Sequence, residues 1–130
     1  MMWIRVHAEL ARSPEYPDGS DRHGYDFILP LDASGRLDRA TYDRAPELCT
    51  VQRFWEGGDD SEGEIEHRSD GRWVFSYLTG EEDDEVIVDF AERVFREGEY
   101  LSVQQASGAE QTLRILLVEP APGLAHTVPR

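Results

Sequence analysis

The chain has 130 residues, a length at which one domain buries roughly two-thirds of the surface that its unfolded chain exposes. Asp and Glu number 27 against 13 basic residues, and the formal net charge of -14 opposes binding to nucleic-acid phosphates or anionic lipid. The hydrophobic share of 39% and the aromatic share of 10% predict a packed core and argue against a disordered chain.

Residues that the chain lacks exclude further chemistry. It has no Lys, so neither a Schiff base nor a Lys general base is available. It also has no Asn, and because Lys and Asn codons are both A-rich, we expect a GC-rich bacterial genome. Cys49 is the single cysteine, which rules out an intrachain disulfide and a Cys-rich zinc site. No stretch has signal-peptide character or the roughly 20 apolar residues of a membrane span, so we expect a cytoplasmic protein.

The first third of the chain predicts two strands joined by a loop. Residues 3–10 alternate in hydropathy, with Ile4, Val6, Ala8 and Leu10 on one face. Residues 13–24 are rich in Pro, Gly, Ser and Asp and favour a surface loop. Residues 25–31 alternate again, with Tyr25, Phe27, Leu29 and Leu31 on one face. Pro30 cannot donate to a sheet ladder, so this strand is predicted at an edge or a bulge.

The rest of the chain predicts a short helix followed by a series of strands. Residues 37–47 have no clear period, and Pro46 would end any helix, so at most one short helix is expected. Six short strands separated by turn-forming residues then follow. Their predicted ranges are 48–56, 63–68, 72–78, 85–90, 99–105 and 111–118.

The connections between these strands favour an antiparallel meander. Asp70-Gly71 is a typical hairpin dipeptide, and Ser107-Gly108 gives a weaker version of the same signal. Residues 91–98 predict a single helical turn closed by Gly98. The fold class is therefore all-β with one or two short helices, as a small barrel or a two-sheet sandwich of about eight strands. Residues 1–119 form one domain, and 120–130 a Pro-rich tail.

Acidic residues concentrate in connections that a meander brings to the same end. Alternate loops share an end, so residues 57–63, 79–85 and 106–110 are expected together. The resulting cluster predicts recognition of a basic partner or of a divalent cation. Neither acidic loop fits the twelve-residue calcium-loop pattern, and a solvated surface is the third interpretation. The predicted residues are Asp59, Asp60, Glu62, Glu81, Glu82, Asp83, Asp84 and Glu85.

Aromatic residues give an alternative site. Trp73, Phe75 and Tyr77 share one face of a strand, with Trp55 on another strand. Such a row is typical of a core, but in a barrel with space inside it would line a pocket for a small apolar ligand. His67 lies on the neighbouring strand and is expected, partly buried, at the mouth of that pocket.

Catalytic motifs are missing from the sequence. It has no Gly-x-Ser-x-Gly elbow, no Gly-rich phosphate loop and no dinucleotide fingerprint. A hydrolase that uses Cys49 or His67 with scattered carboxylates is kept as a distant alternative. We therefore assign no catalytic residue and no required cofactor, and we predict a non-catalytic binding domain.

Overall fold

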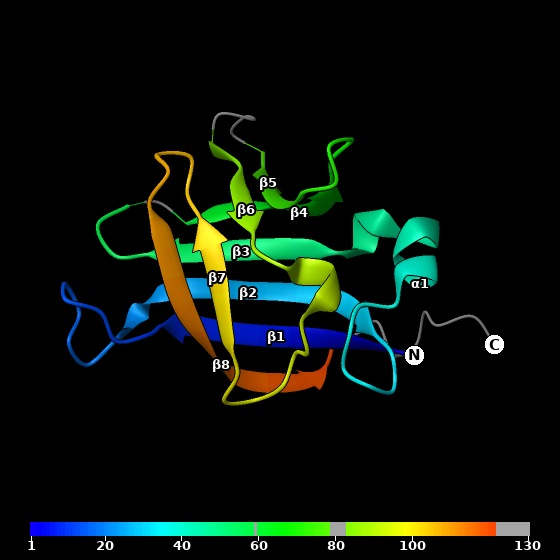
Figure 1. The fold of residues 1–130 in the computed structure, drawn as a ribbon, viewed down its shortest axis with the longest axis horizontal. Coiled ribbons are helices and arrows are strands. Elements are labelled where there is room, and N and C mark those ends of the chain that lie inside the picture. Colours follow the sequence, from blue (N-terminus) through cyan, green and yellow to red (C-terminus); the bar gives the residue numbers. More distant parts are fainter. Residues whose placement is uncertain (59, 79–82, 122–130) are drawn as a thin grey trace.

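Eight antiparallel strands close into a single barrel in this protein (Figure 1). The structure, a computed structural model, describes residues 1–58, 60–78 and 83–121. Each strand pairs with the next along the chain, and β8 pairs with β1, so the barrel alternative is confirmed. The strands are β1 (Met2–Leu10), β2 (Ser20–Leu31), β3 (Thr50–Trp55), β4 (Ser61–His67), β5 (Trp73–Tyr77), β6 (Glu85–Ile87), β7 (Tyr100–Gln104) and β8 (Glu110–Pro120).

The interior is built from the alternating apolar residues of the strands. The faces predicted for the first two strands are confirmed, since Val6 and Ala8 of β1 and Tyr25, Phe27 and Leu29 of β2 are all buried. The two strands pair in register, with Val6 opposite Phe27. A side chain that points inward in one strand therefore meets an inward side chain in the next, as the two-residue period of a strand requires.

Pro30 lies where β2 has a strand neighbour on one side. The β2 strand pairs with β1 through Pro30, but it pairs with β3 only from His23 to Phe27. The missing N–H of Pro30 therefore interrupts no ladder between β2 and β3. The sequence prediction of an edge strand is wrong for β2 as a whole, because it pairs with both β1 and β3, but Pro30 itself lies beyond the part that pairs with β3. The carbonyl of Pro30 accepts a hydrogen bond from the N–H of Asp38 at 2.9 Å.

The helical elements are short. The helix α1 (Arg39–Arg44) confirms the single helix expected over 37–47, and the carboxylate of Asp38 accepts from the N–H of Thr41 at 3.0 Å to cap it. A 3₁₀ turn, η1 (Pro46–Leu48), follows. The helical turn predicted over 91–98 is wrong in position, because the 3₁₀ turn η3 (Phe90–Glu92) has already ended at Glu92. No helix among the described residues is long and apolar enough to cross a bilayer.

The two predicted glycine turns share one geometry. Gly71 has a φ of 91° and donates its N–H to the carbonyl of Arg68 at 2.9 Å. Gly108 has the same φ and donates to Gln105 at 2.8 Å. In each turn only the glycine takes a positive φ among the described residues, which is the pattern of a type I turn followed by a glycine bulge.

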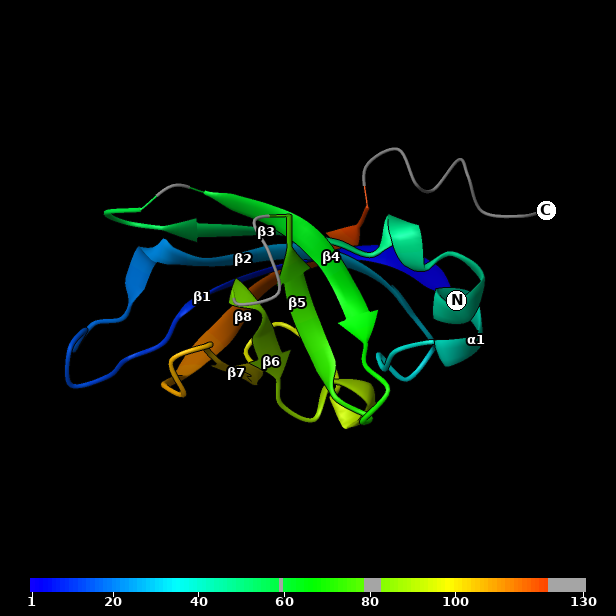
Figure 2. The same ribbon diagram turned by 90° about the horizontal axis from the view of Figure 1, so that it is seen from above.

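The connections divide between the two ends of the barrel. The β3–β4, β5–β6 and β7–β8 connections lie at one end, which we call the mouth, together with the β1–β2 loop. The connections that contain α1, the Gly71 turn and η3 lie at the other end. Figure 2 shows α1 on the opposite side of the molecule from the β1–β2 loop. The predicted tail lies, from residue 122 onward, outside the described residues.

Candidate ligand site at the barrel mouth

The predicted acidic residues occupy different environments. Asp60 and Asp83 are exposed in the connections at the mouth, and Glu62, the second residue of β4, is exposed on the outer wall of the barrel. Asp84 is half-buried and forms an ion pair with Arg68 of the β4–β5 connection. Asp59, Glu81 and Glu82 lie outside the described residues, so the prediction for them stays a prediction.

A single depression at the mouth joins the three connections. It has a volume of about 350 Å³. Ser61 comes from the β3–β4 side, Asp83 from the β5–β6 side and Ser107 from the β7–β8 side. The remaining lining residues are Arg53, Tyr77, Glu85, Gln105 and Ala106. The meander therefore places these three connections around one depression. The prediction of a common acidic end depends on this arrangement.

Glu85 differs from the other predicted acidic residues because it lies inside the barrel. It alternates with Val86 and shares the inward face of β6 with Ile87, and only 4% of it is exposed. Its Oε1 accepts hydrogen bonds from the hydroxyl of Tyr77 at 2.5 Å and from that of Tyr25 at 3.0 Å. These partners replace the water that a buried carboxylate loses.

Arg53 completes this arrangement from β3. Its Nε lies 3.5 Å from Oε2 of Glu85, and its guanidinium packs over the ring of Trp55 at 4.3 Å. The Arg53 side chain is 20% exposed, although its Nε is buried without a hydrogen-bond partner. We call Tyr25, Arg53, Tyr77 and Glu85 the mouth cluster. It links an inward carboxylate, two hydroxyl donors and a cation that reaches the surface depression.

The environment shifts the pKa values of the carboxyl and the two hydroxyls of the mouth cluster. Burial raises the pKa of Glu85, while the hydrogen bond from Tyr77 and the charge of Arg53 act in the opposite direction. Burial and the nearby Glu85 raise the pKa of Tyr25 and of Tyr77 above the usual tyrosine value. Both hydroxyls therefore stay protonated at neutral pH and act as donors to Glu85.

The aromatic residues predicted to line a pocket run along the barrel. Phe75 is fully buried and stacks on Tyr25 with ring centroids 5.0 Å apart. Trp73 is buried at the far end of β5, where it packs against Tyr42 at 4.8 Å. Tyr77 belongs to the mouth cluster, and the half-buried Trp55 lies beside it. Contacts with other rings are typical of core packing, and a ligand role for Trp73 and Phe75 stays a prediction.

His67 lies at the opposite end from the depression, not at its mouth. It is exposed and stacks on Trp73 at 4.4 Å. Its Nδ1 lies 3.0 Å from Nη2 of Arg39 and accepts from it, because a guanidinium can only donate. Cys49, the other residue considered for hydrolysis, is fully buried, and burial raises its pKa to about 12. A thiol in that state is a poor nucleophile.

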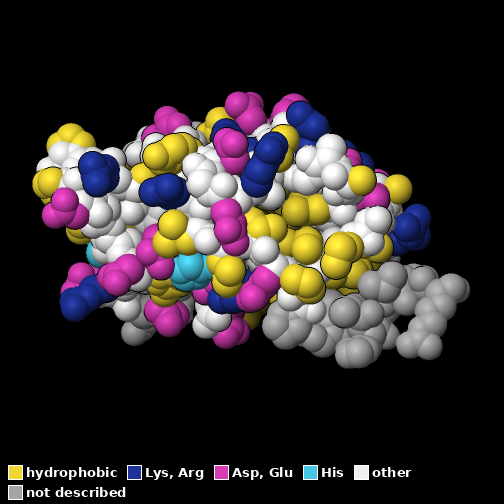
Figure 3. All heavy atoms as spheres, turned by 90° about the horizontal axis from the view of Figure 1, so that it is seen from below, with side chains coloured by type: hydrophobic (Ala, Val, Ile, Leu, Met, Phe, Trp, Pro, Cys, Tyr) yellow, Lys and Arg dark blue, Asp and Glu magenta, His cyan; other side chains and the backbone are white. Residues whose placement is uncertain are grey.

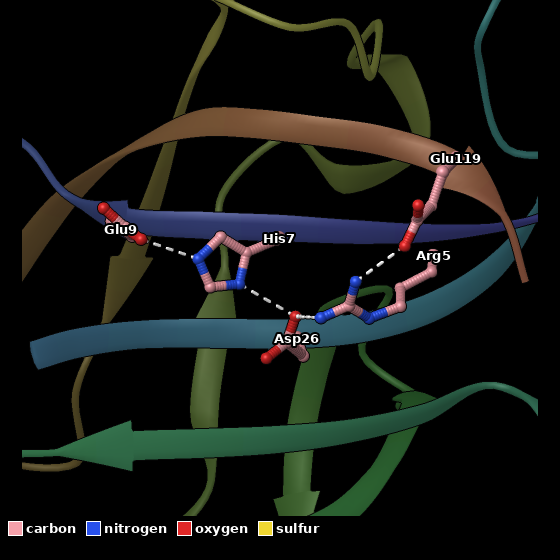
Figure 4. A network of polar contacts seen from close by, with 5 residues as sticks. All are labelled: Arg5, His7, Glu9, Asp26 and Glu119. Carbon is pink, nitrogen blue, oxygen red and sulfur yellow. Dashed lines mark hydrogen bonds and ion pairs between the residues drawn. The ribbon is translucent and has the colours of Figure 1, made fainter. Parts of the chain in front are cut away.

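A second polar network lies on the outer wall of β1, β2 and β8 (Figure 4). Asp26 accepts from Arg5 and lies 2.9 Å from Nδ1 of His7, while Nε2 of His7 is 2.7 Å from Glu9. Arg5 also donates to Glu119 at 2.7 Å. The network covers sheet surface with mutually paired charges. Its sequence signal is the polar alternation of Arg5, His7 and Glu9, opposite Asp26 on the next strand.

Sequence reasoning missed Arg53 and Gln105 at the depression and the hydroxyl of Tyr25 in the mouth cluster. The sequence predicted Tyr25 in the core, and its ring lies there. Its hydroxyl donates to Glu85, which is 60 positions away in the chain. The useful signal at Arg53 is a charged residue next to apolar and aromatic strand residues, Phe54 and Trp55. That pattern leaves open whether the guanidinium points inward.

Comparisons with known proteins add no family to this geometry. No protein-family model matches the chain, and neither a curated protein nor a solved structure is found similar to it. Within residues 1–58, 60–78 and 83–121, no group of three or more His, Cys, Asp or Glu side chains is arranged to hold a metal ion.

Proposed function

We propose that the barrel mouth of this protein is a non-catalytic binding site that receives a basic segment of a partner protein. The observation that carries the proposal is the depression where three connections meet beneath exposed carboxylates. Its charged lining consists of Asp83, Glu85 and Arg53, so negative groups outnumber positive ones. Asp60 and Glu62 lie exposed on the flanking β3–β4 side. This charge balance favours a cationic group in or above the depression.

The shape of the site supports the same partner. Ser61, Gln105 and Ser107 offer hydrogen-bonding groups around the depression, and its volume of about 350 Å³ accommodates a basic side chain. The guanidinium of Arg53 is held against Trp55 and Glu85 at one side. A partner cation would therefore meet the exposed carboxylates first and hydrogen-bond acceptors below them.

The experiment must separate the mouth from the general charge of the protein. Acidic side chains are also scattered over other faces, as the face in Figure 3 illustrates. The test variant carries Asp60→Asn, Glu62→Gln and Asp83→Asn. The matched control neutralises three exposed carboxylates elsewhere and changes the net charge by the same amount. Its substitutions are Glu47→Gln, Glu92→Gln and Glu97→Gln.

The probe is a fluorescein-labelled peptide of nine arginines, titrated by fluorescence anisotropy at near-physiological salt. Three exposed ion pairs at about 0.5 kcal/mol each correspond to roughly tenfold weaker binding for the mouth variant. The control variant is expected to lose no more than about twofold. Equal losses in the two variants would mean that only net charge matters and would refute a specific mouth site.

A second candidate function is binding of a small polar molecule in the same depression. Its volume lies in the range of small-molecule sites, and Tyr77 and Gln105 are among its lining residues. Ser107→Trp would fill the depression from its exposed rim. Fragments that raise the melting temperature of the wild type, but not of this variant, would support the candidate. Fragments that stabilise both proteins equally would count against it.

A further inference from the structure

An irregularity in β2 places a serine against a buried histidine. Along β1, Glu9 pairs with Gly24 while the next residue, Leu10, pairs with Ser20. Residues 21–23 therefore lie outside the β1 ladder, although His23 still pairs with Trp55 of β3. Bulges of this kind redirect side chains, and they are frequent beside active sites.

The bulge positions two groups of complementary chemistry. Oγ of Ser20 lies 2.7 Å from Nδ1 of His23, and it accepts a hydrogen bond from the N–H of Arg22 at 3.2 Å. His23 is only 2% exposed. Its ring is held between Tyr16, with centroids 5.0 Å apart, and Trp55, at 4.6 Å. The imidazole is thus fixed within hydrogen-bonding distance of a hydroxyl, which is the arrangement of a nucleophile and its general base.

Ser20 opens onto a larger cavity than the one at the mouth cluster. This cavity has a volume of about 910 Å³, and Tyr16, Gly19 and Ser20 form part of its wall. Two exposed apolar side chains, Tyr100 at 51% and Leu116 at 42%, line the same space. The rest of the lining is largely charged and includes Glu9, Arg12 and Arg114. A substrate that reaches Ser20 therefore meets two apolar side chains within a mainly polar surface, and these two suit one small aromatic group.

We propose that Ser20 and His23 form a nucleophile–base pair that hydrolyses small carboxylic esters with an aromatic alcohol group. This proposal goes beyond the binding function above and does not depend on it. The two sites share the half-buried Trp55, whose ring contacts His23 on one side and Arg53 on the other. The functional atoms of each site are otherwise supplied by different residues.

The reaction uses only the ester and water. Nδ1 of His23 accepts the hydroxyl proton of Ser20 as Oγ bonds to the carbonyl carbon, and the carbonyl oxygen takes up the negative charge. The bond from the carbonyl carbon to the aryl oxygen then breaks, and the protonated His23 gives its proton to the leaving phenolate. In the deacylation step, His23 takes a proton from a water molecule as the oxygen of that water attacks the acyl carbon. The carboxylic acid leaves, and the proton returns to Oγ of Ser20.

A purely structural role for the Ser20–His23 hydrogen bond predicts a different result. In that case the bond only holds the bulge, and Oγ of the half-buried Ser20 has no greater reactivity than the hydroxyl of an exposed serine such as Ser69. Acylation at Ser20 therefore distinguishes the two roles. The chain is suited to this measurement because it contains no Lys, the side chain that most often reacts with activated esters, and its single Cys is buried.

The experiment incubates the wild-type protein with p-nitrophenyl acetate and follows release of p-nitrophenolate, with acetylation mapped by mass spectrometry of proteolytic fragments. Ser20→Ala and His23→Gln are the test variants, and Ser69→Ala, in an exposed turn, is the control. General-base assistance supplies about 10²-fold or more, so we expect each test variant to lose at least about 90% of the protein-dependent rate. We also expect an acetyl group on Ser20 of the wild type.

His23 is buried, so His23→Gln also requires a test of its fold. Far-ultraviolet circular dichroism and the urea midpoint of each variant supply that test, and Ser20→Ala alone decides the outcome if His23→Gln is unfolded. Wild-type rates equal to those of Ser20→Ala would overturn the proposal. Acetylation confined to the N-terminus or to Tyr100 would overturn it equally.

Discussion

Replacing Tyr77 by Phe removes one hydroxyl from the mouth cluster without leaving a large cavity. That hydroxyl donates to Glu85 at 2.5 Å in a buried environment. A hydrogen bond to a charged group contributes about 1.5–3 kcal/mol, against about 0.5–1.5 kcal/mol for a neutral one. We therefore expect Tyr77→Phe to lower the free energy of unfolding by about 2–3 kcal/mol at pH 7.

Tyr42 provides the matched control. Its hydroxyl is also buried, but it donates to a neutral group, the carbonyl of Ile65, at 2.9 Å. Tyr42→Phe is expected to cost about 1 kcal/mol. Urea denaturation followed by tryptophan fluorescence gives both values, and the same experiment at pH 4 adds a second comparison. Because burial raises the pKa of Glu85, the carboxyl is protonated at that pH, and the excess cost of Tyr77→Phe should shrink.

An ionised Glu85 requires two results. Tyr77→Phe must cost more than Tyr42→Phe at pH 7, and the difference must narrow under acid conditions. Equal costs at pH 7, or a difference that does not change with pH, would refute an ionised Glu85 as the acceptor.

Three further predictions concern other parts of the barrel. Cys49 is fully buried with a pKa of about 12, so we expect it to react with Ellman's reagent at pH 8 only after the protein is unfolded. Gly63→Ala would place a Cβ 2.0 Å from a carbonyl oxygen of the neighbouring strand and should lower the free energy of unfolding by roughly 3 kcal/mol. Gly58 has space for a Cβ, so Gly58→Ala should change the free energy of unfolding by less than about 0.5 kcal/mol. Urea denaturation measures both values. Burial lowers the pKa of His7, but hydrogen bonds to two carboxylates outweigh it, and the net pKa is raised. The stability that His7 contributes should therefore be full below about pH 6.5 and decline as the pH rises through the raised pKa, and comparison of urea midpoints with His7→Gln across that range measures it.

Strand positions were predictable because alternation is a local property. Trp3 to Leu10 and Tyr25 to Leu31 present large apolar side chains at every second position, and the structure buries that face in both strands. Closure was not predictable by the same means. It depends on the pairing of β1 with β8, whose residues Arg5 and Glu119 are separated by almost the whole chain. A sandwich would have buried the same alternating faces.

The location of Glu85 could not be derived from alternation. The sequence Glu85-Val86-Ile87-Val88 has apolar residues at three successive positions, so either face of this short strand could be the inner one. Hydrophobicity alone would place Val86 and Val88 inside and Glu85 outside. In the barrel Glu85 and Ile87 point inward instead, because the hydroxyls of Tyr25 and Tyr77 supply hydrogen-bond partners for a carboxylate in the interior. Those partners come from strands that no local pattern connects to β6.

Variants of the mouth cluster can separate its contribution to the stability of the barrel from its contribution to ligand binding. Removing only Glu85, as in Glu85→Leu, leaves the guanidinium of Arg53 and two hydroxyls without their acceptor, and we expect a loss of about 3 kcal/mol or more. Replacing the whole cluster by apolar residues of similar size removes every one of those unpaired groups. Such replacements of buried ionic clusters are often neutral or stabilising, because they eliminate the desolvation of the charges.

The variant that tests this separation combines Tyr25→Phe, Arg53→Met, Tyr77→Phe and Glu85→Leu. We expect it to unfold in urea with a free energy equal to or above that of the wild type. The nona-arginine peptide should still bind it more weakly, because the depression has lost the acceptor oxygens of Glu85, while the paired loss of Glu85 and Arg53 leaves the net charge of the lining unchanged. A variant that is several kcal/mol less stable than the wild type would show that the cluster holds the barrel together. In that case the polar groups inside the mouth would be explained by folding, and the proposed site would depend on the exposed carboxylates alone.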